Sequence, residues 1–336
     1  MGWLRTCVCY GAIELLRRST NNRLVLVTGA EGFIGAHLTD VLVRSGWSVL
    51  AVDRRFTAAP RQEQRVTRHT VDIADREFMR LVRGARPGVI VHLAAQSSLA
   101  ALEREPDQGL RDNILATANV LEAGVAVGVR KIVFASSAAV YGHAEELPIR
   151  EEAALKPISA YGWSKAAGEQ LVLRSAAQHG HEYAILRLGN VYGPGQELKP
   201  DPGVVATWFA RLLDSLPLPI TGGGAPTRDF LFVNDAAEAL LAALVQGHAE
   251  TINIAGGNET SLSELARLMC AVSGTESQHV AHTGPPGEIM RSVLDPTRAR
   301  HALGWKAFTP LELGLRRTWS AMVAGRRKVA TANATN

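Results

Sequence analysis

The sequence has few cysteines and no long apolar run. Only 3 of its 336 residues are cysteines, at Cys7, Cys9 and Cys270. This sparse, odd number excludes a disulfide framework and is typical of a reducing compartment. No apolar run approaches the ~18 residues that a membrane-spanning helix needs. We therefore expect a cytoplasmic protein without membrane insertion.

The sequence also lacks a strong excess of charge of either sign. Lys and Arg total 36 and Asp and Glu total 32, which gives a formal net charge of +4. The nearest thing to a basic run is "GRRKVA" at 325–330, so the basic stripe that nucleic acid requires is missing. Cys7 and Cys9 have no other ligand types beside them. We expect neither a nucleic-acid partner nor a metal site.

The first 22 residues are interpreted as an extension ahead of the first strand. They begin "MGWLRT", which fits the loose pattern of N-terminal acylation. The apolar stretch that follows is interrupted by Glu14, and no clear cleavage site comes after it. The rest of the composition, 46% hydrophobic with 31 Gly and 15 Pro, is typical of a globular domain with many turns.

From Arg23 onwards, strand-like and helix-like segments alternate. Apolar runs at 23–29, 48–53, 89–95, 131–137 and 180–193 predict strands, and apolar residues at helical spacing over 33–46 and 111–129 predict helices. Strands that are apolar throughout predict a parallel sheet covered on both faces. The predicted fold is α/β, a Rossmann-type doubly wound parallel sheet.

After Tyr192 the sequence becomes rich in Pro and Gly, as in "GPGQELKPDPG". This change predicts a smaller, discontinuous C-terminal substrate domain. We assign residues 23–190 plus 229–257 to the Rossmann domain. Residues 191–228 plus 258–324 form the substrate domain, and residues 325–336 are predicted to be a disordered tail.

A glycine-rich loop joins the first predicted strand to the first helix. "VTGAEGFIG" contains Gly29, Gly32 and Gly35, with the spacing G-x-x-G-x-x-G. Glycines there allow backbone N–H groups and a helix N-terminus to approach a pyrophosphate. Asp53 ends the second strand, where an acid binds the adenosine ribose hydroxyls and favours NAD over NADP. Arg54 and Arg55 directly after it leave NADP open, because arginine can hold a 2′-phosphate.

Tyr161 and Lys165 stand four residues apart at the start of a predicted helix. They share one helix face, which is typical of a proton-transfer pair but also of a solvated surface pair. Lowering a phenol pKa by ~3 units takes ~4 kcal/mol, which a nearby ammonium and a positive nicotinamide could supply. Ser137 ends a strand at the edge where such sheets bind ligands. For Ser136 beside it, a structural role in ending the strand and a functional role fit the pattern equally well.

Eight motifs appear in an order that resembles a known family. They are "TGAEGFIG", "VDIAD", "HLAAQSS", "SSAAVYG", "YGWSK", "RLGNVYGPGQ", "TRDFLFVND" and "RSVLDPTRARHALGW". The chain from about Arg23 to Trp305 resembles the extended short-chain dehydrogenases/reductases. Within them it is most similar to the nucleotide-sugar epimerase/dehydratase group, and there to UDP-hexose 4-epimerases.

The resemblance implies NAD-dependent 4-epimerisation of a UDP-sugar, either a hexose or an N-acetylhexosamine, by transient oxidation at C4. Tyr161 would be the general base, Lys165 would bind the ribose and tune the base, and Ser137 would hold the hydroxyl. The implied cofactor-binding residues are Gly29, Gly32, Phe33, Ile34, Gly35, Asp53, Asp72, Ile73, Leu93, Ala94, Ala95, Asn113, Tyr161 and Lys165. The implied substrate-binding residues are Ser137, Asn190, Arg228, Arg291 and Ser292. The family also implies a homodimer through helices around 112–127 and 161–177.

Two departures from the family pattern narrow the reaction. Family members that dehydrate have Asp-Glu where this chain has Ala138 and Ala139, and decarboxylating relatives have a Glu at the second position. Both reactions need an extra acid or base that alanine cannot supply. Epimerisation is favoured, with two alternatives: an NAD(P)H-dependent reductase of a 4-keto nucleotide sugar, and a non-catalytic NAD-binding regulator. Ser292 leaves room for an N-acetyl group.

Overall fold

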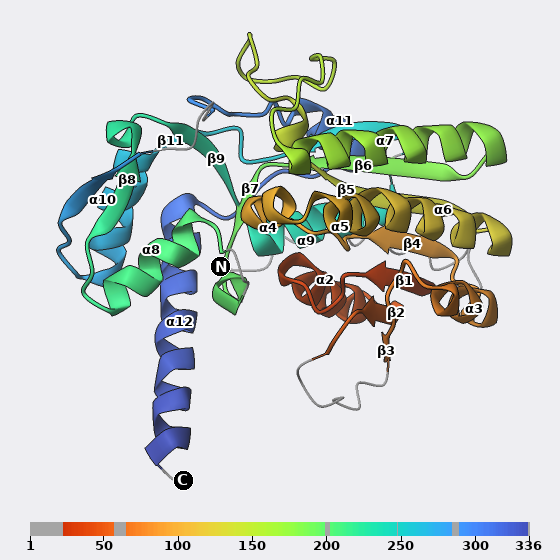
Figure 1. Ribbon diagram of the computed structural model, residues 1–336, viewed down its shortest axis with the longest axis horizontal. Helices are drawn as coiled ribbons and strands as arrows, with labels where there is room; N and C mark the ends of the chain where they lie inside the picture. Colours follow the sequence, from red (N-terminus) through yellow and green to blue (C-terminus); the bar gives the residue numbers. More distant parts are fainter. Residues whose placement is uncertain (1–22, 57–64, 199–201, 247, 284–288, 335–336) are drawn as a thin grey trace, which may run out of the picture.

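The main element of the fold is a seven-stranded, wholly parallel sheet (Figure 1). The computed structural model describes residues 23–56, 65–198, 202–246, 248–283 and 289–334, so the predicted extension 1–22 lies outside the described residues. The strands are β1 (Leu24–Thr28), β2 (Ser48–Asp53), β3 (Val66–Thr70), β4 (Val89–His92), β5 (Lys131–Ser137), β6 (Glu182–Leu188) and β10 (Glu250–Ile254). Their order is β10-β6-β5-β4-β1-β2-β3, which confirms the predicted Rossmann-type sheet.

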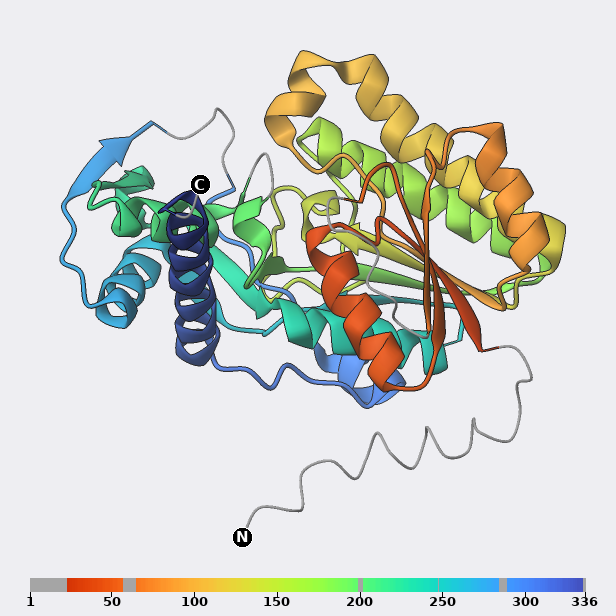
Figure 2. The ribbon, with the colours of Figure 1, turned by 90° about the horizontal axis from the view of Figure 1, so that it is seen from below.

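Helices cover both faces of this sheet, as Figure 2 shows. One face packs against α2 (Phe33–Arg44), α9 (Val233–Val245) and α11 (Thr297–Leu303). The other packs against α3 (Arg76–Ala85), α6 (Ala116–Val127) and α7 (Ala160–His179). Alternate side chains of one strand serve the two cores: Val25 and Val27 lie in the first, and Leu26 lies in the second. This explains why the strands are apolar throughout.

A smaller region beside the sheet contains two short sheets and three helices (Figure 1). The strands β7 (Asn190–Tyr192), β9 (Thr227–Phe232) and β11 (Glu259–Ser261) form one sheet, and β8 (Leu218–Thr221) with β12 (His279–His282) forms the other. The helices α8 (Val204–Leu213), α10 (Leu262–Ser273) and α12 (Leu311–Ala334) share a core that includes Phe209, Leu265 and Leu315. Short helical turns complete the chain: α4 (Leu99–Arg104), α5 (Pro106–Leu110), η1 (Arg111–Leu115), η2 (Ala138–Val140), η3 (Gln196–Leu198) and η4 (Gly222–Gly224).

Two expected boundaries differ from the structure. The run 180–193 is not one strand, because the chain leaves the main sheet after Leu188 and pairs again from Asn190 with β9. Residues 297–305, expected in the substrate domain, belong to the main sheet by packing. Ala299, Leu303 and Trp305 are buried in the first core, and burying a leucine side chain such as that of Leu303 contributes ~2 kcal/mol. The finer domain bounds stay a prediction.

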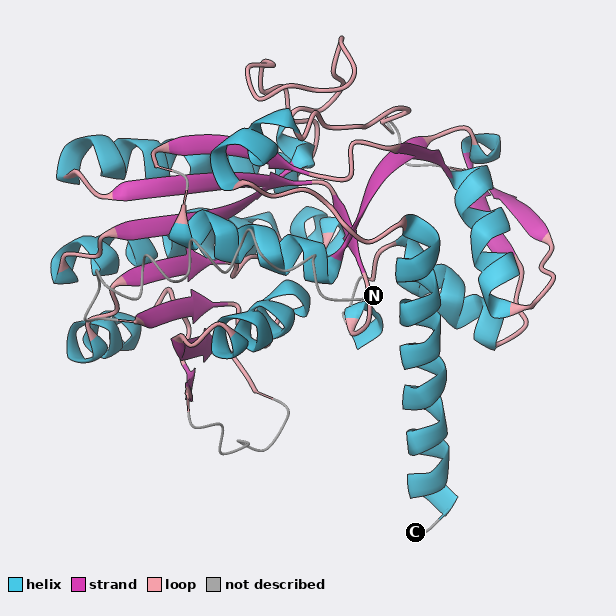
Figure 3. Ribbon diagram, turned by 180° about the vertical axis from the view of Figure 1, so that it is seen from behind, coloured by secondary structure: helices cyan, strands magenta, loops and turns pink. Residues whose placement is uncertain are grey.

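The predicted disordered tail, 325–336, stays a prediction, but the structure continues a helix through most of this segment. The helix α12 continues to Ala334 and extends away from the body of the molecule (Figure 3). Its first half is fixed by the buried residues Leu315, Thr318 and Met322. Once nucleated, a helix extends cheaply through Ala, Arg and Lys, which are good helix formers, and this part contains no proline.

Candidate cofactor and catalytic site

A cavity of about 650 Å³ lies at the carboxyl edge of the main sheet. It opens where β1 and β4 are neighbours but their connections leave in opposite directions, which is the usual ligand site of such sheets. Its lining includes eight of the predicted cofactor-binding residues: Gly29, Gly32, Phe33, Asp53, Ile73, Leu93, Ala94 and Ala95. Ile34 and Gly35 lie in the first turn of α2 beside it.

The glycine loop brings backbone to backbone where a side chain would not fit. Gly29 has a φ of +72°, and a Cβ on it would lie 2.7 Å from the amide nitrogen of Ala94. A Cβ on Gly35 would lie 2.0 Å from the carbonyl oxygen of Gly29. The first turn of α2 therefore packs directly on the loop, and its N-terminus lines the cavity through Gly32 and Phe33. This geometry fits a pyrophosphate.

The end of the cavity next to β2 is acidic. Asp53 lines it and accepts a hydrogen bond from the amide of Glu31 at 3.0 Å. Arg54, one of the two residues that left NADP open, is bound by two other carboxylates. Its Nη1 lies 2.9 Å from Asp112 Oδ2, its Nη2 binds the other oxygen of Asp112, and its Nε lies 3.1 Å from Asp72 Oδ2. These bonds use three of the five N–H groups of the guanidinium, including one on each prong that a 2′-phosphate would approach.

The cavity wall after β4 is tied to the start of α7 by Asn113. Its Oδ1 accepts the amide of Gln96 at 2.7 Å, and its Nδ2 donates to the Gln96 carbonyl at 3.0 Å and to Ser164 Oγ at 2.8 Å. Ser164 in turn donates to the carbonyl of Tyr161 at 2.8 Å. The first turn of α7 is thus held in register with the wall of the cavity.

A buried histidine supports the same wall. The ring of His92 lies 2.7 Å from Thr28 Oγ1 on one side and 2.9 Å from Thr117 Oγ1 on the other. Burial, with a smaller contribution from the charge of Lys165, lowers the pKa of His92 to about 3. A neutral imidazole therefore links β1, β4 and α6 at the end of β4, just before residues 93–96 of the cavity wall.

The three predicted catalytic side chains gather at the ends of β5 and α7. Ser137 ends β5, and Tyr161 and Lys165 follow the Ser159 N-cap of α7, with the Lys165 Nζ 5.8 Å from the centre of the Tyr161 ring. Burial raises the pKa of Tyr161 to about 12, and a side-chain hydrogen bond to Ser137 opposes this rise. The expected lowering of this pKa by Lys165 and the nicotinamide together stays a prediction.

Lys165 is itself held in a specific position. Its side chain is buried and its Nζ donates to the carbonyl of Ala135 at 2.7 Å. Burial lowers the pKa of Lys165 to about 8, while the charge of Glu169 opposes this shift. The alternative of a solvated surface pair is therefore wrong, because Lys165 is only 4% exposed.

Ser136 has a structural contact of its own. Its hydroxyl donates to Glu169 at 2.5 Å, and Glu169 forms a buried two-pronged ion pair with Arg187 at 2.7 and 2.9 Å. The pair joins α7 to β6. This agrees with the interpretation of Ser136 as the residue that ends a strand.

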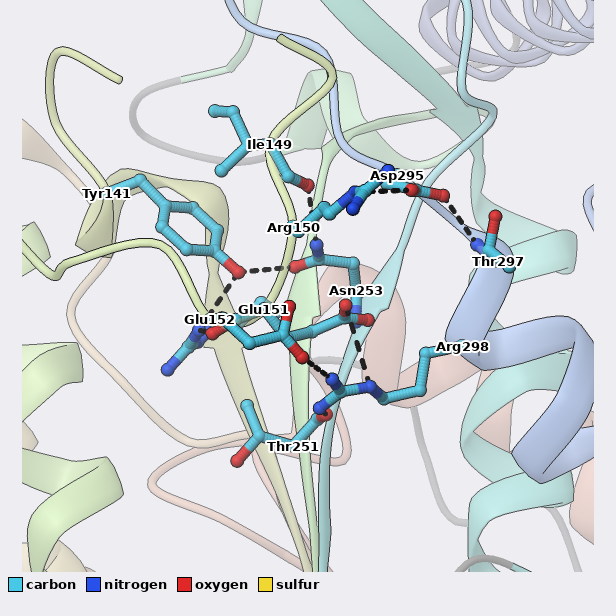
Figure 4. Close-up of polar contacts among 11 residues, drawn as sticks. Tyr141, Ile149, Arg150, Glu151, Glu152, Thr251, Asn253, Asp295, Thr297 and Arg298 are labelled. Carbon is cyan, nitrogen blue, oxygen red and sulfur yellow. Dashed lines mark hydrogen bonds and ion pairs between the residues drawn. The ribbon is translucent and has the colours of Figure 1, made fainter. Parts of the chain in front are cut away.

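The loop from Ser137 to α7 is fixed by polar contacts with β10 and α11 (Figure 4). The Tyr141 hydroxyl donates to Asn253 Oδ1 at 2.7 Å, and Asn253 Nδ2 donates to the carbonyl of Ile149 at 2.9 Å. Arg298 binds the Thr251 carbonyl at 3.1 Å and ion-pairs with Glu151. This loop is therefore anchored at several points between two of the predicted catalytic residues.

The predicted substrate residues lie apart from the cavity, in the small region. Asn190 is exposed at the start of β7, and Arg228 on β9 donates to the Ile289 carbonyl at 2.6 Å. Arg291 is held by both oxygens of Glu259 at 2.7 Å each. Ser292 is half-buried next to it. None of the four lines the cavity described above.

Several cavity residues were not predicted. They are Glu31, Ala36, His37, Val52, Val71, Gln96, Asp112, Pro194 and Gly195, with Arg54 and Arg55 weighed only as an ambiguity. Pro194 stands in the quoted motif "RLGNVYGPGQ", and its carbonyl lies 2.9 Å from the His37 ring. Asp112 precedes the predicted Asn113. The motif was a usable signal for Pro194, and the position next to a predicted residue was one for Asp112.

Comparisons with known proteins find a matching family model and similar proteins. The model of the NAD dependent epimerase/dehydratase family matches residues 25–255. The chain belongs to this family. It is 35% identical to a putative UDP-glucose 4-epimerase of Methanocaldococcus jannaschii, over 88% of this chain and 96% of that one.

Solved structures of the family superpose closely. A UDP-glucose 4-epimerase of Thermotoga maritima, solved with UDP-glucose, gives a TM-score of 0.86 at 34% identity over 90% of this chain and 99% of that one. A UDP-glucose 4-epimerase of Thermus thermophilus, solved in complex with NAD, gives 0.82 at 32% identity over 89% and 99%.

Membership confirms the predicted resemblance, the enzyme class and the cofactor. The protein is an NAD-dependent enzyme of the epimerase/dehydratase family. Within the described residues, no helix combines the length and the apolar character required to cross a membrane.

Proposed function

We propose that this enzyme interconverts the C4 epimers of a UDP-sugar, either the glucose and galactose pair or the N-acetylhexosamine pair. The observation that supports this best is the grouping of Ser137, Tyr161 and Lys165 next to the wall of the NAD cavity. The names of the relatives point the same way, since both the curated relative and the solved structures reported above are described as UDP-glucose 4-epimerases.

In this proposal Tyr161 removes the proton of the sugar 4-hydroxyl and later returns one. Ser137 holds that hydroxyl, since it already bonds the Tyr161 side chain. When bound, NAD⁺ supplies a hydride acceptor and the positive charge that the phenol needs to ionise near neutral pH. Lys165 holds the cofactor ribose and adds a second positive charge at its fixed position.

The neighbouring residues favour epimerisation over the other reactions of the family. Ala138 and Ala139 follow Ser137 in the turn η2, where they can supply neither an acid nor a base. Elimination and decarboxylation need such a group. Tyr161 would therefore act on the 4-hydroxyl without a second proton donor at the other side of the sugar.

We further propose that Asn190, Arg228, Arg291 and Ser292 bind the nucleotide diphosphate and the sugar. The two arginines lie on adjacent segments, because Arg228 donates to the carbonyls of Thr227 and Ile289, and the Thr227 amide donates to the carbonyl of Met290. Arginine suits phosphate because its planar fork binds two oxygens. Ser292 would leave space for an N-acetyl group.

We also propose a homodimer in the cytoplasm. The surface formed by η1 and α7 exposes large apolar side chains, with Leu115 61% and Trp163 63% exposed. Ile158, just before α7, is 49% exposed. Grouped apolar side chains on neighbouring helices are typical of a protein–protein contact.

Proton NMR of the purified protein with UDP-glucose, UDP-galactose and their N-acetyl counterparts tests the function, with no cofactor added. Conversion of one C4 epimer into the other establishes the reaction, and the relative rates identify the sugar. Tyr161→Phe is the matched control and should lower the rate ~1,000-fold or more. Absence of turnover, even with added NAD⁺, would refute the UDP-hexose proposal. Consumption of external NAD(P)H with a 4-keto sugar would support the reductase instead.

A further inference from the structure

A charged bridge crosses the adenosine end of the NAD cavity. Arg54 follows β2, Asp72 follows β3, and Asp112 lies in the π-helical turn η1. The three nitrogens of the Arg54 guanidinium are all used: Nε by Asp72, and Nη1 and Nη2 by the two oxygens of Asp112. The bridge therefore connects segments that are 18 and 58 residues apart in the sequence.

The Asp112 carboxylate, which accepts two hydrogen bonds from Arg54, is buried and is held by a further contact. The Asp112 side chain is only 5% exposed, while the Arg54 side chain is 46% exposed. Gln108 Nε2 donates to Asp112 Oδ1 at 2.7 Å, and the amide of Ala74 donates to Asp72 Oδ1 at 2.8 Å. A buried carboxylate with a two-pronged partner is a strong and directional contact. Single π turns of this kind occur often at functional sites.

The bridge also changes the charge that a cofactor meets. Arg54 and Asp112 both line the cavity, as do Asp53 and Arg55. With Asp72 and the lining residue Glu31, four carboxylates stand against the guanidinium groups of Arg54, Arg55 and the neighbouring Arg111, so this end of the cavity is net negative. A 2′-phosphate brings about two further negative charges and finds Arg54 already bonded on both prongs.

We propose that Arg54, held by Asp112 and Asp72, selects NAD over NADP and retains the adenosine half of NAD. Asp53 alone would disfavour a 2′-phosphate, but the two arginines after it would offset this effect. The bridge removes Arg54 from that role and uses it to join β2 to η1 beside Val71 and Ile73, which supply the apolar lining. The inference concerns the cofactor only and does not depend on which sugar is the substrate.

Titration calorimetry with NAD⁺ and NADP⁺ tests the bridge in three variants. Asp112→Asn keeps the shape of the side chain but frees Arg54, so NADP⁺ should bind at least about tenfold more tightly relative to NAD⁺. Arg54→Gln removes the bridge, so NAD⁺ should bind about tenfold more weakly. The double variant should bind NAD⁺ no more weakly than Arg54→Gln, because both changes break one contact.

Arg111→Gln is the matched control. It removes an equal charge next to Asp112 but outside the cavity lining. If Asp112→Asn leaves the ratio of the two affinities unchanged while its circular dichroism matches wild type, the selection proposal is wrong. If Arg111→Gln has the same effect as Arg54→Gln, a general charge effect replaces the bridge and the proposal also falls. Arg54→Lys, which keeps the charge but not the fork, covers the case in which Arg54→Gln fails to fold.

Discussion

At the scale of single residues, the protein's own groups do not ionise the phenol of Tyr161, the proposed base. Burial raises the pKa of its phenol to about 12, and only the Ser137 hydrogen bond opposes this. At neutral pH the phenol is therefore protonated when only the protein's own groups surround it. We infer that ionisation is coupled to the positively charged, oxidised cofactor, which would confine the base to the state that can use it.

His92 gives a prediction on pH and stability. Its folded pKa of about 3 is below the usual 6.5, so between these values only the unfolded chain binds the proton. Stability from this group is therefore complete above pH 6.5 and falls as the pH drops toward 3. At about 1.36 kcal/mol per pH unit, wild type should lose ~2 kcal/mol more than His92→Gln between pH 7 and pH 5.

Urea unfolding at the two pH values measures this difference. His143→Gln, at an exposed histidine, is the control and should follow wild type. Equal loss of stability in wild type and in His92→Gln would show that the buried imidazole is not held neutral.

At the scale of elements, the buried pair of Glu169 and Arg187 fixes α7 on the sheet. Their side chains are 1% and 7% exposed, and the pair also binds Ser136 and the Tyr141 hydroxyl. Because Tyr161 lies in the first turn of α7, the same contact sets the place of the proposed base relative to Ser137 at the end of β5.

Breaking this pair should be costly. Removing one partner of a buried ion pair leaves an uncompensated charge, so Glu169→Gln should lower the free energy of unfolding by ~3–5 kcal/mol. The exposed pair of Glu312 and Arg316 on α12 is the matched control, and Glu312→Gln should cost less than ~1 kcal/mol. Thermal and urea unfolding of both variants give the comparison. Similar costs for the two variants would contradict the role assigned to the buried pair.

The sequence predicted those parts of the site that depend on local pattern. Gly29 and Asp53 are each positioned by the strand that precedes them, so strand periodicity and spacing were enough. The partner of Arg54 could not be found this way, because Asp112 is 58 residues away and only the fold brings them together. The same holds for Glu259, which binds Arg291 from β11.

Element types were predicted better than element limits. The break at Gly189 depends on pairing with β9, which lies almost 40 residues later. The helix α12 depends on the contacts of its first half with α8 and α10, and composition alone suggested disorder for its end. The place of α11 depends on Leu303 and Trp305 entering a core shared with α9 and β10, elements that only the fold brings next to it.

At the scale of the whole molecule, the proposed homodimer makes a clear prediction. Trp163→Glu places a charge on the apolar surface of η1 and α7, so the protein should become monomeric in light scattering after gel filtration. Phe308→Glu is the control, since Phe308 is 57% exposed but bonds to α9 on the opposite face of the sheet. A Trp163→Glu protein with the mass of wild type, or a monomeric wild type, would rule out this interface.

The central claim is that one retained cofactor oxidises and re-reduces the same carbon. The most direct test is proton and deuterium NMR of the product from a UDP-galactose labelled with deuterium at C4, in ordinary water without added cofactor. Our account predicts UDP-glucose that keeps the deuterium at C4. Loss of the label to water, or its appearance in free NADH, would contradict transient oxidation at C4 within a closed cycle.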